Sequence, residues 1–502
     1  MDKIPLHLSK LAEQAFERNG SYDAYYFEGE WLNTGVLDDK VKRLGRSLVD
    51  LGLGPGDRVL VMMANCPEVG MTYAATWRAG GAVTPAMFLL SPEDLRHIIE
   101  DCRPTTVVTT PEFASSLKQA TEGLDFIRNF ISTAPADGFT TFDDLMGAEP
   151  GGIVDRDPSD LACLLYTGGT TGRAKGVMLS HENMVMGAKA AYEAAGVIEG
   201  ETSLYTLPLA HGYGIVSSVV AYFSTGSHAY LMRWFDPSTW LNMIQEHRIR
   251  RSQLVPTMIQ MLLSLPLEEY DLGCLEIVNS GAAPLAPETL QEFERRVPSA
   301  TVLEGYGATE SGIVGSVNRK ENRKIGTVGT PMPGYEIKAF NDDNNELPPG
   351  EPGEICIRSS AVMLGYWNSP EETADALKNG WLHTGDIGTV DEEGFIKIVD
   401  RKKDLIIRGG FNIFPRDIED VLLEHPAVEV AGVVGKPDER LGEEVVAFVS
   451  IRPGQTATSE ELIEHCRQKL GKHKYPREVR LAGYIPLTPV GKVDRKALRA
   501  QL

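Results

Sequence analysis

The stretch Tyr166-Thr-Gly-Gly-Thr-Thr-Gly-Arg-Ala-Lys-Gly176 follows an apolar run at 161–165 that is typical of a buried strand. Its glycines allow a sharp turn that brings backbone N–H groups close to a ligand. Three threonine hydroxyls and the charge of Lys175 add groups that bind phosphate. The spacing differs from that of the P-loop, because Arg173 follows Gly172 where Lys-Ser/Thr would stand. The stretch predicts a polyphosphate-binding loop; the alternative is a plain Gly/Thr-rich turn.

Strands and helices alternate on both sides of this loop. Apolar spacing predicts a helix over 36–51, and β-branched runs predict strands before and after it. This alternation indicates an α/β fold with parallel sheets covered by helices on both faces. The expected elements of this part are strands at 58–63, 82–84, 106–109, 203–207 and 276–281, and helices at 68–78 and 92–100.

The pattern changes after residue 326. Short strands between Pro/Gly turns, at 335–340, 353–358 and 394–399, predict a β-rich subdomain. A smaller unit follows, in which Pro415 opens a helix and 458–461 form a capping box for another. We therefore divide the chain into an N-terminal domain at 1–400, a hinge at 401–404 and a C-terminal domain at 405–502.

Composition and charge exclude some classes of partner. The 502 residues include 49 Lys and Arg against 70 Asp and Glu, so the net charge of −21 argues against nucleic-acid binding and against charge-driven docking on an anionic membrane. Six cysteines lie far apart without a C-x-x-C pair, as is typical of a reducing compartment. We see no signal peptide and no integral membrane segment. The prediction is a cytoplasmic protein, with a homodimer as a compatible oligomeric state.

The loop at 166–176 resembles the phosphate loop of the adenylate-forming superfamily, which includes acyl- and aryl-CoA synthetases, amino-acid adenylation domains and beetle luciferases. One departure is Gly168, where many members carry Ser. The resemblance extends over nearly the whole chain. It implies a large N-terminal domain of two doubly wound sheets plus a distorted β-barrel, followed by a small mobile α+β C-terminal domain.

Further motifs support this resemblance and imply a nucleotide site. Gly305-Tyr-Gly-Ala-Thr-Glu310 resembles the family's Y-G-x-T-E motif, in which Tyr306 stacks on adenine, Thr309 contacts the α-phosphate and Glu310 holds Mg²⁺. Thr384-Gly-Asp386 resembles the motif that binds the ribose hydroxyls. The nucleotide-binding residues implied are Thr167, Gly168, Gly169, Thr170, Thr171, Gly281, Ala282, Ala283, Tyr306, Gly307, Asp386, Ile398 and Arg401.

The resemblance also implies a hinge and a thiol tunnel. Lys403 falls at the hinge position, about which the C-terminal domain swings between an adenylating and a thioester-forming arrangement. Gly409 and Gly410 would line the tunnel of the thiol, and Leu441 stands where some CoA ligases carry an aromatic residue that packs on CoA.

The catalytic residues implied are Lys492, Thr309, His211 and Lys175. Pro486-Leu-Thr-Pro-Val-Gly-Lys492 resembles the motif of the adenylation lysine. His211 matches the histidine at the mouth of the acyl pocket, although Ala210 replaces the usual aromatic residue before it. A satisfied buried histidine is the alternative for His211.

The implied reaction activates a carboxylic acid with MgATP to acyl-AMP and then transfers the acyl group to a thiol. Small residues around His211 suggest a roomy apolar pocket, so we expect a medium- to long-chain fatty acid, with a bulky aryl acid as the alternative. Free CoA is the expected acceptor and a carrier-protein thiol the runner-up. A non-catalytic binding protein would lack residues such as Lys175, Glu310, Asp386 or Lys492, which are all present. No feature of the sequence specifically indicates a luciferase-like oxidation.

Overall fold

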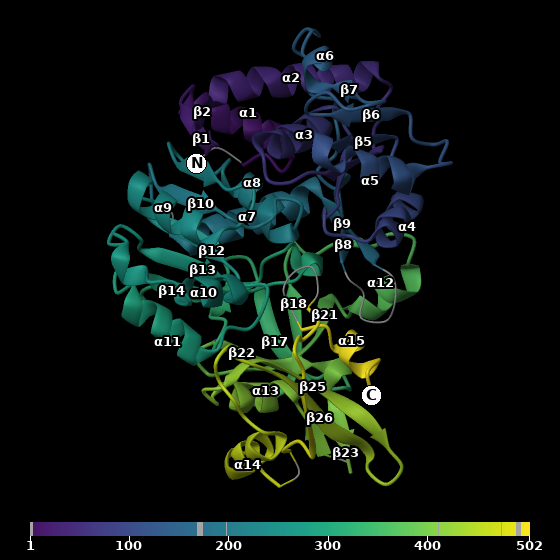
Figure 1. Ribbon diagram of the computed structural model, residues 1–502. Coiled ribbons are helices and arrows are strands. Elements are labelled where there is room, and N and C mark those ends of the chain that lie inside the picture. The colour runs from purple at the N-terminus through teal and green to yellow at the C-terminus, as the bar shows by residue number, and fades with distance from the viewer. Residues whose placement is uncertain (1–3, 168–173, 197, 410, 473, 488–492) are drawn as a thin grey trace.

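The computed structural model describes residues 4–167, 174–196, 198–409, 411–472, 474–487 and 493–502. Four β-sheets organise the chain: one of eight strands, one of nine, and two of five (Figure 1). Helices pack around the two large sheets, which form the purple-to-teal part of the ribbon, and the C-terminal sheet lies beneath them in yellow-green. The predicted α/β class is confirmed. Within these residues, no helix has the length and apolar character needed to cross a membrane.

The eight-stranded sheet has a parallel centre that is buried on both faces. β3 pairs in parallel with β4 on one side and with β5 on the other. Burial on both faces explains why these strands are rich in valine and other apolar residues and show no polar alternation. The strands predicted at 58–63, 82–84, 106–109 and 161–165 are confirmed here. In pairing order the sheet consists of β19 (Gly365–Tyr366), β9 (Lys175–Ser180), β8 (Leu161–Thr167), β4 (Ala82–Pro85), β3 (Arg58–Met62), β5 (Thr106–Thr109), β6 (Asn129–Ser132) and β7 (Thr140–Thr141).

The nine-stranded sheet includes a hairpin from the N-terminus that the sequence analysis did not predict. This hairpin, β1 and β2, joins the sheet because β1 pairs in parallel with β11, far along the chain. The strand predicted at 203–207 ends two residues early, at Tyr205, before the turn that contains Pro208. In pairing order the sheet consists of β16 (Thr330–Pro331), β15 (Ser316–Val317), β14 (Thr301–Tyr306), β13 (Ile277–Ser280), β12 (Arg251–Leu254), β10 (Thr202–Tyr205), β11 (His228–Leu231), β1 (Asp23–Phe27) and β2 (Glu30–Asn33).

The β-rich segment forms an antiparallel five-stranded sheet. Its pairing order ends at β17 and β20, so among the described strands it is an open sheet where we expected a distorted barrel. β22 pairs with β21 outside this order and leads directly into the linker η3 (Lys402–Asp404). The strands are β17 (Glu336–Phe340), β18 (Gly353–Arg358), β21 (Trp381–Val390), β20 (Leu377–Lys378) and β22 (Ile396–Arg401).

The last sheet has its own apolar core and its own helices. Pro415 opens α13 as predicted, and the capping box at α14 is present: the backbone N–H of Glu461 donates to Thr458 Oγ1 at 3.2 Å, and that of Thr458 donates to Glu461 Oε2 at 2.8 Å. The elements are β24 (Phe411–Ile413), β23 (Ile406–Arg408), β26 (Gly442–Ile451), β25 (Val428–Asp438), β27 (Glu478–Leu481), α13 (Pro415–Leu423), α14 (Ser459–Lys469) and α15 (Arg495–Arg499).

Helices cover the large sheets, and several begin with a proline that needs no hydrogen-bond partner for its nitrogen. At α4 the Ser91 hydroxyl also accepts from the backbone N–H of Asp94 at 3.1 Å. The helices of this part are α1 (Leu8–Asn19), α2 (Thr34–Asp50), α3 (Pro67–Arg78), α4 (Pro92–Cys102), α5 (Pro111–Thr121), α6 (Phe142–Leu145), α7 (His181–Ala195), α8 (Gly212–Val220), α9 (Pro237–His247), α10 (Pro256–Leu263), α11 (Pro287–Arg296) and α12 (Pro370–Ala376), with the short 3₁₀ turns η1 (Leu267–Glu269) and η2 (Thr309–Ser311).

Candidate active site

One cavity of about 1470 Å³ receives residues from both large sheets, from β21 and β22, and from the C-terminal segment. Parallel strands direct their carboxyl ends, and the loops that follow them, to one edge of a sheet. The predicted site residues that line this cavity are Thr167, Lys175, His211, Gly281, Ala282, Ala283, Tyr306, Gly307, Thr309, Glu310, Asp386, Ile398, Arg401 and Lys403. Six others, Gly168, Gly169, Thr170, Thr171, Gly410 and Lys492, lie outside the described residues.

The two ends of the predicted phosphate loop are held side by side. β8 and β9 pair antiparallel, and Thr167 lies opposite Lys175 in their register. Lys175 Nζ forms an ion pair with Glu372 Oε1 of α12 at 2.9 Å and lies 5.4 Å from the ring centre of Tyr366. An anionic ligand that bound Lys175 would therefore compete with an exposed carboxylate, which the sequence did not reveal.

The end of β14 places Tyr306, Gly307 and η2 at the cavity. A Cβ on Gly307 would lie 2.4 Å from the carbonyl oxygen of Ile313, so only glycine fits there. Ile313 itself has φ +81°, a strained conformation for a β-branched residue. The Tyr366 hydroxyl donates to Glu310 Oε1 at 3.0 Å and fixes that carboxylate.

The residues at Glu310 fit a divalent cation held with a nucleotide. Among the residues described, no group of three or more His, Cys, Asp or Glu side chains could hold a metal by itself. Mg²⁺ is commonly held by one or two carboxylates together with substrate phosphates. Glu310 faces the cavity and supplies the hard oxygen ligand that this arrangement requires.

Asp386 connects β14 to the end of the β-rich sheet. Its side chain is only 7% exposed, and it accepts from the Tyr306 hydroxyl at 2.6 Å and from Arg401 Nε at 2.9 Å. Asp386 and Arg401 lie opposite each other in the β21–β22 register. Burial and the Asp386 carboxylate hold the pKa of Tyr306 well above its usual value, so the phenol remains a neutral donor. The aromatic ring and the carboxylate are thus fixed relative to one another.

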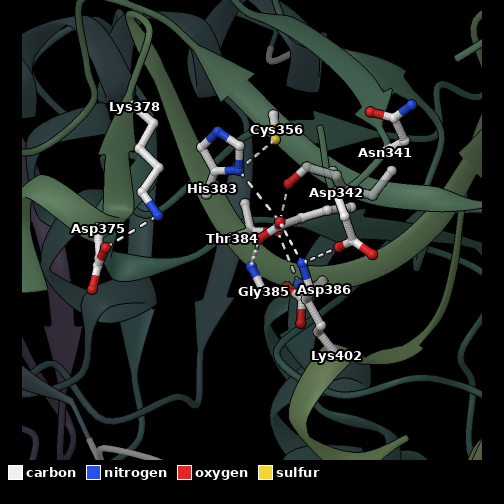
Figure 2. A network of polar contacts seen from close by, with 12 residues as sticks. Asn341, Asp342, Cys356, Asp375, Lys378, His383, Thr384, Gly385, Asp386 and Lys402 are labelled. Carbon is white, nitrogen blue, oxygen red and sulfur yellow. Dashed lines mark hydrogen bonds and ion pairs between the residues drawn. The ribbon is translucent and has the colours of Figure 1, made fainter. Parts of the chain in front are cut away.

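A second polar network supports the Asp386 loop from behind (Figure 2). Glu354 Oε1 accepts from the backbone N–H of Gly385 at 3.0 Å, and its Oε2 lies 3.3 Å from His383 Nδ1. Lys402, at the start of the linker, contacts the same Glu354 oxygen at 3.5 Å and Asp342 at 2.7 Å. The backbone next to Asp386 is therefore connected to the residue next to Lys403. No motif in the sequence indicates this network.

The loop after β13 brings a short backbone segment to the cavity. Ala282 has φ +66°, which favours glycine, so this segment is held in a strained turn. Its neighbours Gly281 and Ala283 leave space because they have little or no side chain. Ile398 of β22 lines another part of the same cavity.

A buried charge cluster fastens the linker to the C-terminal helix. Arg495 contacts Glu419 at 2.7 Å, Asp404 at 3.3 Å and Asp400 at 3.7 Å, and Arg499 contacts Asp404 at 2.7 Å. Burial raises the pKa of Asp400 to about 6. The segment 493–496, which directly follows Lys492, lines the cavity.

Two of the predicted residues lie elsewhere. Gly409 and Leu441 are neighbours, because the backbone N–H of Gly409 donates to the carbonyl of Leu441 at 2.7 Å. Neither belongs to the cavity lining described above. The structure therefore brings these two together but separates them from the predicted site residues that line the cavity.

His211 marks the other end of the cavity, at the start of α8. Its Nδ1 accepts from the backbone N–H of Tyr213 at 3.4 Å and so caps the helix. Residues 211–217 contain no arginine or lysine, but Arg251 of β12 also lines the cavity. This arginine is buried and paired with Glu201 at 2.9 Å, and it donates to Asn279 at 3.1 Å. Arg251 stands on a strand outside the motif around His211, so the sequence alone does not indicate that it reaches the cavity.

Comparisons with known proteins agree with this geometry. Residues 11–367 match the AMP-binding enzyme family, and residues 417–492 match the AMP-binding enzyme C-terminal domain. The chain is 36% identical to a long-chain-fatty-acid–CoA ligase of Bacillus subtilis (strain 168), over 92% of this chain and 88% of that protein. It is 33% identical to 4-coumarate–CoA ligase 5 of Oryza sativa subsp. japonica, over 100% and 95%. ATP-bound MatB from Rhodopseudomonas palustris superposes with a TM-score of 0.91 at 30% identity, with 98% of each chain covered.

Proposed function

Since the chain belongs to the AMP-binding enzyme family and is an AMP-forming acid–thiol ligase that uses ATP, Mg²⁺ and CoA, we propose that the cavity residues divide the reaction among them. Asp386 and Arg401 bind the ribose, and the ring of Tyr306 lies against adenine. Thr309 and Lys175 bind phosphate, and Glu310 holds Mg²⁺. The observation that carries this assignment is the Tyr306–Asp386–Arg401 contact, which fixes a ring and a diol acceptor in one place.

The first half-reaction joins two anions, so the protein must position them and neutralise charge. The acid's carboxylate oxygen attacks the α-phosphorus of ATP, an acyl–O–phosphorus bond forms, and pyrophosphate leaves. Bound Mg²⁺ supplies electrostatic stabilisation of the phosphates. Lys492 contributes positive charge to the developing oxyanion; the cavity-lining position of 493–496 supports this role. His211 borders the acid's end of the cavity.

The second half-reaction needs a different surface of the C-terminal domain. In this proposal the CoA thiol attacks the acyl carbon, AMP leaves, and Gly409, Gly410 and Leu441 line the path of the thiol after rotation about Lys403. The position of Gly409 and Leu441 away from the cavity supports an arrangement suited to adenylation. We place the domain boundary at 401–404. The strand before it, β22, pairs with β21 of the β-rich sheet, and the strand after it, β23, pairs with β26 of the last sheet.

For the acid we propose a molecule with a large apolar tail, a medium- to long-chain fatty acid. The cavity volume and the apolar wall made by Val41, Met71 and Trp77 support this, as does the similarity to a long-chain-fatty-acid–CoA ligase. A dicarboxylate is disfavoured because Arg251 is already paired with Glu201. An aryl acid is the second candidate, favoured by tyrosines in the cavity wall and by the similarity to a 4-coumarate–CoA ligase.

The proposal also includes the location of the enzyme in the cell and its oligomeric state. We place the enzyme in the cytoplasm, which is supported by six free cysteines, five of them buried. A homodimer stays a prediction that sedimentation would test.

Product analysis by mass spectrometry tests the proposal. The protein is incubated with MgATP and a panel of aliphatic and aryl acids, with and without CoA, and a reaction without MgATP is the control. Acyl-CoA and AMP together are the expected products. Accumulation of acyl-AMP that does not react with CoA would instead indicate a carrier-protein thiol as the acceptor. Absence of AMP and of any acyl product with every acid would contradict the proposed function.

A further inference from the structure

Four tyrosines meet at the end of the cavity near His211, and the assigned reaction does not use their hydroxyls. We call Tyr25, Tyr205, Tyr213 and Tyr222 the tyrosine cluster; all four line the cavity. Tyr25 comes from the N-terminal hairpin, Tyr205 from β10, and the other two from α8 and the turn after it. Residues from distant parts of the chain therefore converge on one place.

The strand register puts two of these side chains on one face of the nine-stranded sheet. Tyr25 lies opposite Ala229 of β11, and Ala229 lies opposite Ser203 of β10. Directly paired residues of parallel strands project to the same face, and residues two apart on one strand do so as well. Tyr205, two residues after Ser203, therefore shares the face of Tyr25. The small side chains of Ser203 and Ala229 leave space between them.

The hydroxyls of the cluster are available to a ligand. None of them forms a hydrogen bond with any residue that the structure describes, whereas the nearby hydroxyl of Tyr73 donates to the carbonyl of Leu209 at 3.1 Å. Burial raises the pKa of Tyr205 and of Tyr213 to about 12, so both are neutral at physiological pH. A neutral phenol both donates and accepts a hydrogen bond.

These groups suit a tail that carries a polar group at its end better than they suit a purely hydrocarbon tail. A tail that displaced water from the cluster would leave several buried hydroxyls unpaired, which is unfavourable. A tail that ended in a hydroxyl would instead exchange hydrogen bonds with them. Aromatic side chains also pack well on a flat ring. The site thus prefers an acid that is apolar in its middle and polar at its far end.

We propose that the tyrosine cluster is a tail subsite that selects carboxylic acids bearing a hydroxyl group at the end remote from the carboxylate. The inference rests on the proposed ligase function and narrows its substrate class. The hydroxyl belongs to a phenolic acid or to an ω-hydroxy fatty acid, two sources that share this chemistry.

The test compares matched acids that differ only in that hydroxyl. The pairs are para-hydroxycinnamate with cinnamate, and ω-hydroxydodecanoate with dodecanoate, and the readout is kcat/KM for CoA thioester formation. We expect the hydroxylated member of one pair to be favoured about tenfold or more. The pair that shows this preference identifies the source. Each lost neutral hydrogen bond corresponds to roughly a threefold to tenfold change.

Two conservative variants and one matched control separate recognition from folding. Tyr205→Phe and Tyr25→Phe should each lower the hydroxyl preference by about threefold to tenfold. Tyr26→Phe should leave it unchanged, because Tyr26 packs at 5.3 Å from the rings of Trp31 and Tyr230, outside the cavity. Melting temperatures verify that all three variants fold.

The outcomes are distinct. Equal or better use of the unsubstituted acid in both pairs overturns the tail subsite and leaves the ligase function intact. A hydroxyl preference that survives both tyrosine variants also overturns it. If no acid yields AMP or thioester, the proposed function itself fails, and the inference fails with it.

Discussion

Replacement of Arg495 by methionine should destabilise the joint between the linker and the C-terminal helix. Arg495 is only 19% exposed and lies between three carboxylates that are still more buried. After the change, Asp404 keeps Arg499 as a partner, and Asp400 keeps the backbone N–H groups of Arg401 and Arg416. The buried carboxylates therefore lose part of their compensation, but not all of it.

The expected loss of stability follows from the partners that the buried carboxylates keep. Removal of one partner of a buried ion pair typically costs about 3–5 kcal/mol. We expect about 3 kcal/mol at pH 8, the low end of that range, because partial partners remain. Asp400 has a folded-state pKa of about 6, raised by burial, and loss of Arg495 raises it further. The unfolded chain has an ordinary aspartate pKa of about 3.9.

The sign of the pH dependence is therefore fixed. Between pH 8 and pH 5.5 the folded variant takes up a proton at Asp400 that the unfolded chain does not bind, so its stability rises as the pH falls. Each pH unit over which one such proton is bound contributes about 1.4 kcal/mol. The wild type takes up this proton only near and below pH 6 and therefore gains less over the same interval, so the difference between variant and wild type should shrink from about 3 to about 1 kcal/mol.

Hydrogen exchange, followed by mass spectrometry and corrected for intrinsic rates, measures the free energy of opening of α13 and α15 at both pH values. The exposed Arg452→Met is the matched control and should change neither peptide. An Arg495→Met chain as stable as the wild type at pH 8 would refute the reasoning. An equal loss of opening free energy at both pH values would show that protonation of Asp400 does not offset the loss of Arg495.

Three other changes have definite expected outcomes. Lys492→Ala should slow acyl-AMP formation by about 10²–10³-fold, while acyl-AMP supplied from outside is still converted to thioester; loss of both half-reactions in single-turnover assays would contradict its role. Asp386→Asn should weaken ATP binding in calorimetry by tenfold or more, as two charge-assisted contacts are lost, and should leave CoA binding unchanged. Burial lowers the pKa of His181 to about 3, so the unfolded chain binds the proton first and stability is lost as the pH falls below about 6.5. Between pH 7 and pH 5, the free energy of unfolding of His181→Asn, measured with urea, should therefore fall by about 2 kcal/mol less than that of the wild type. Equal falls in the two proteins would show that His181 does not cause this pH dependence.

The parallel strands could be predicted from the sequence because their signal is local. β3, β4 and β5 are short apolar runs bounded by turns, and burial on both faces leaves no room for polar alternation. The hairpin β1–β2 could not be predicted in the same way. Its partner β11 lies far along the chain, and residues 23–27 carry no strict alternation. A pairing of this kind depends on the tertiary fold.

The site shows the same division. Tyr306, Asp386 and Glu310 stand in short motifs, so the sequence could indicate them individually. Their fixing contacts come from elsewhere: the hydroxyl of Tyr366 holds Glu310, and the exposed carboxylate of Glu372 pairs with Lys175. A contact between residues so far apart in sequence leaves no periodic pattern.

This division separates the chemistry of the enzyme from its choice of acid. The groups to which we assign nucleotide binding stand at the ends of β8, β13 and β14, in the loops that follow them, and on β21 and β22, whereas the tyrosine cluster stands on β1, β10, α8 and the turn after α8. Because the proposed nucleotide site includes no residue of the cluster, Tyr205→Phe should change kcat/KM among acids without changing the Kd of ATP. Asp386→Asn should do the reverse and slow all acids by a common factor. A variant of the cluster that weakened ATP binding as much as acid selection would show that the two ends of the cavity are coupled, and the division would then be wrong.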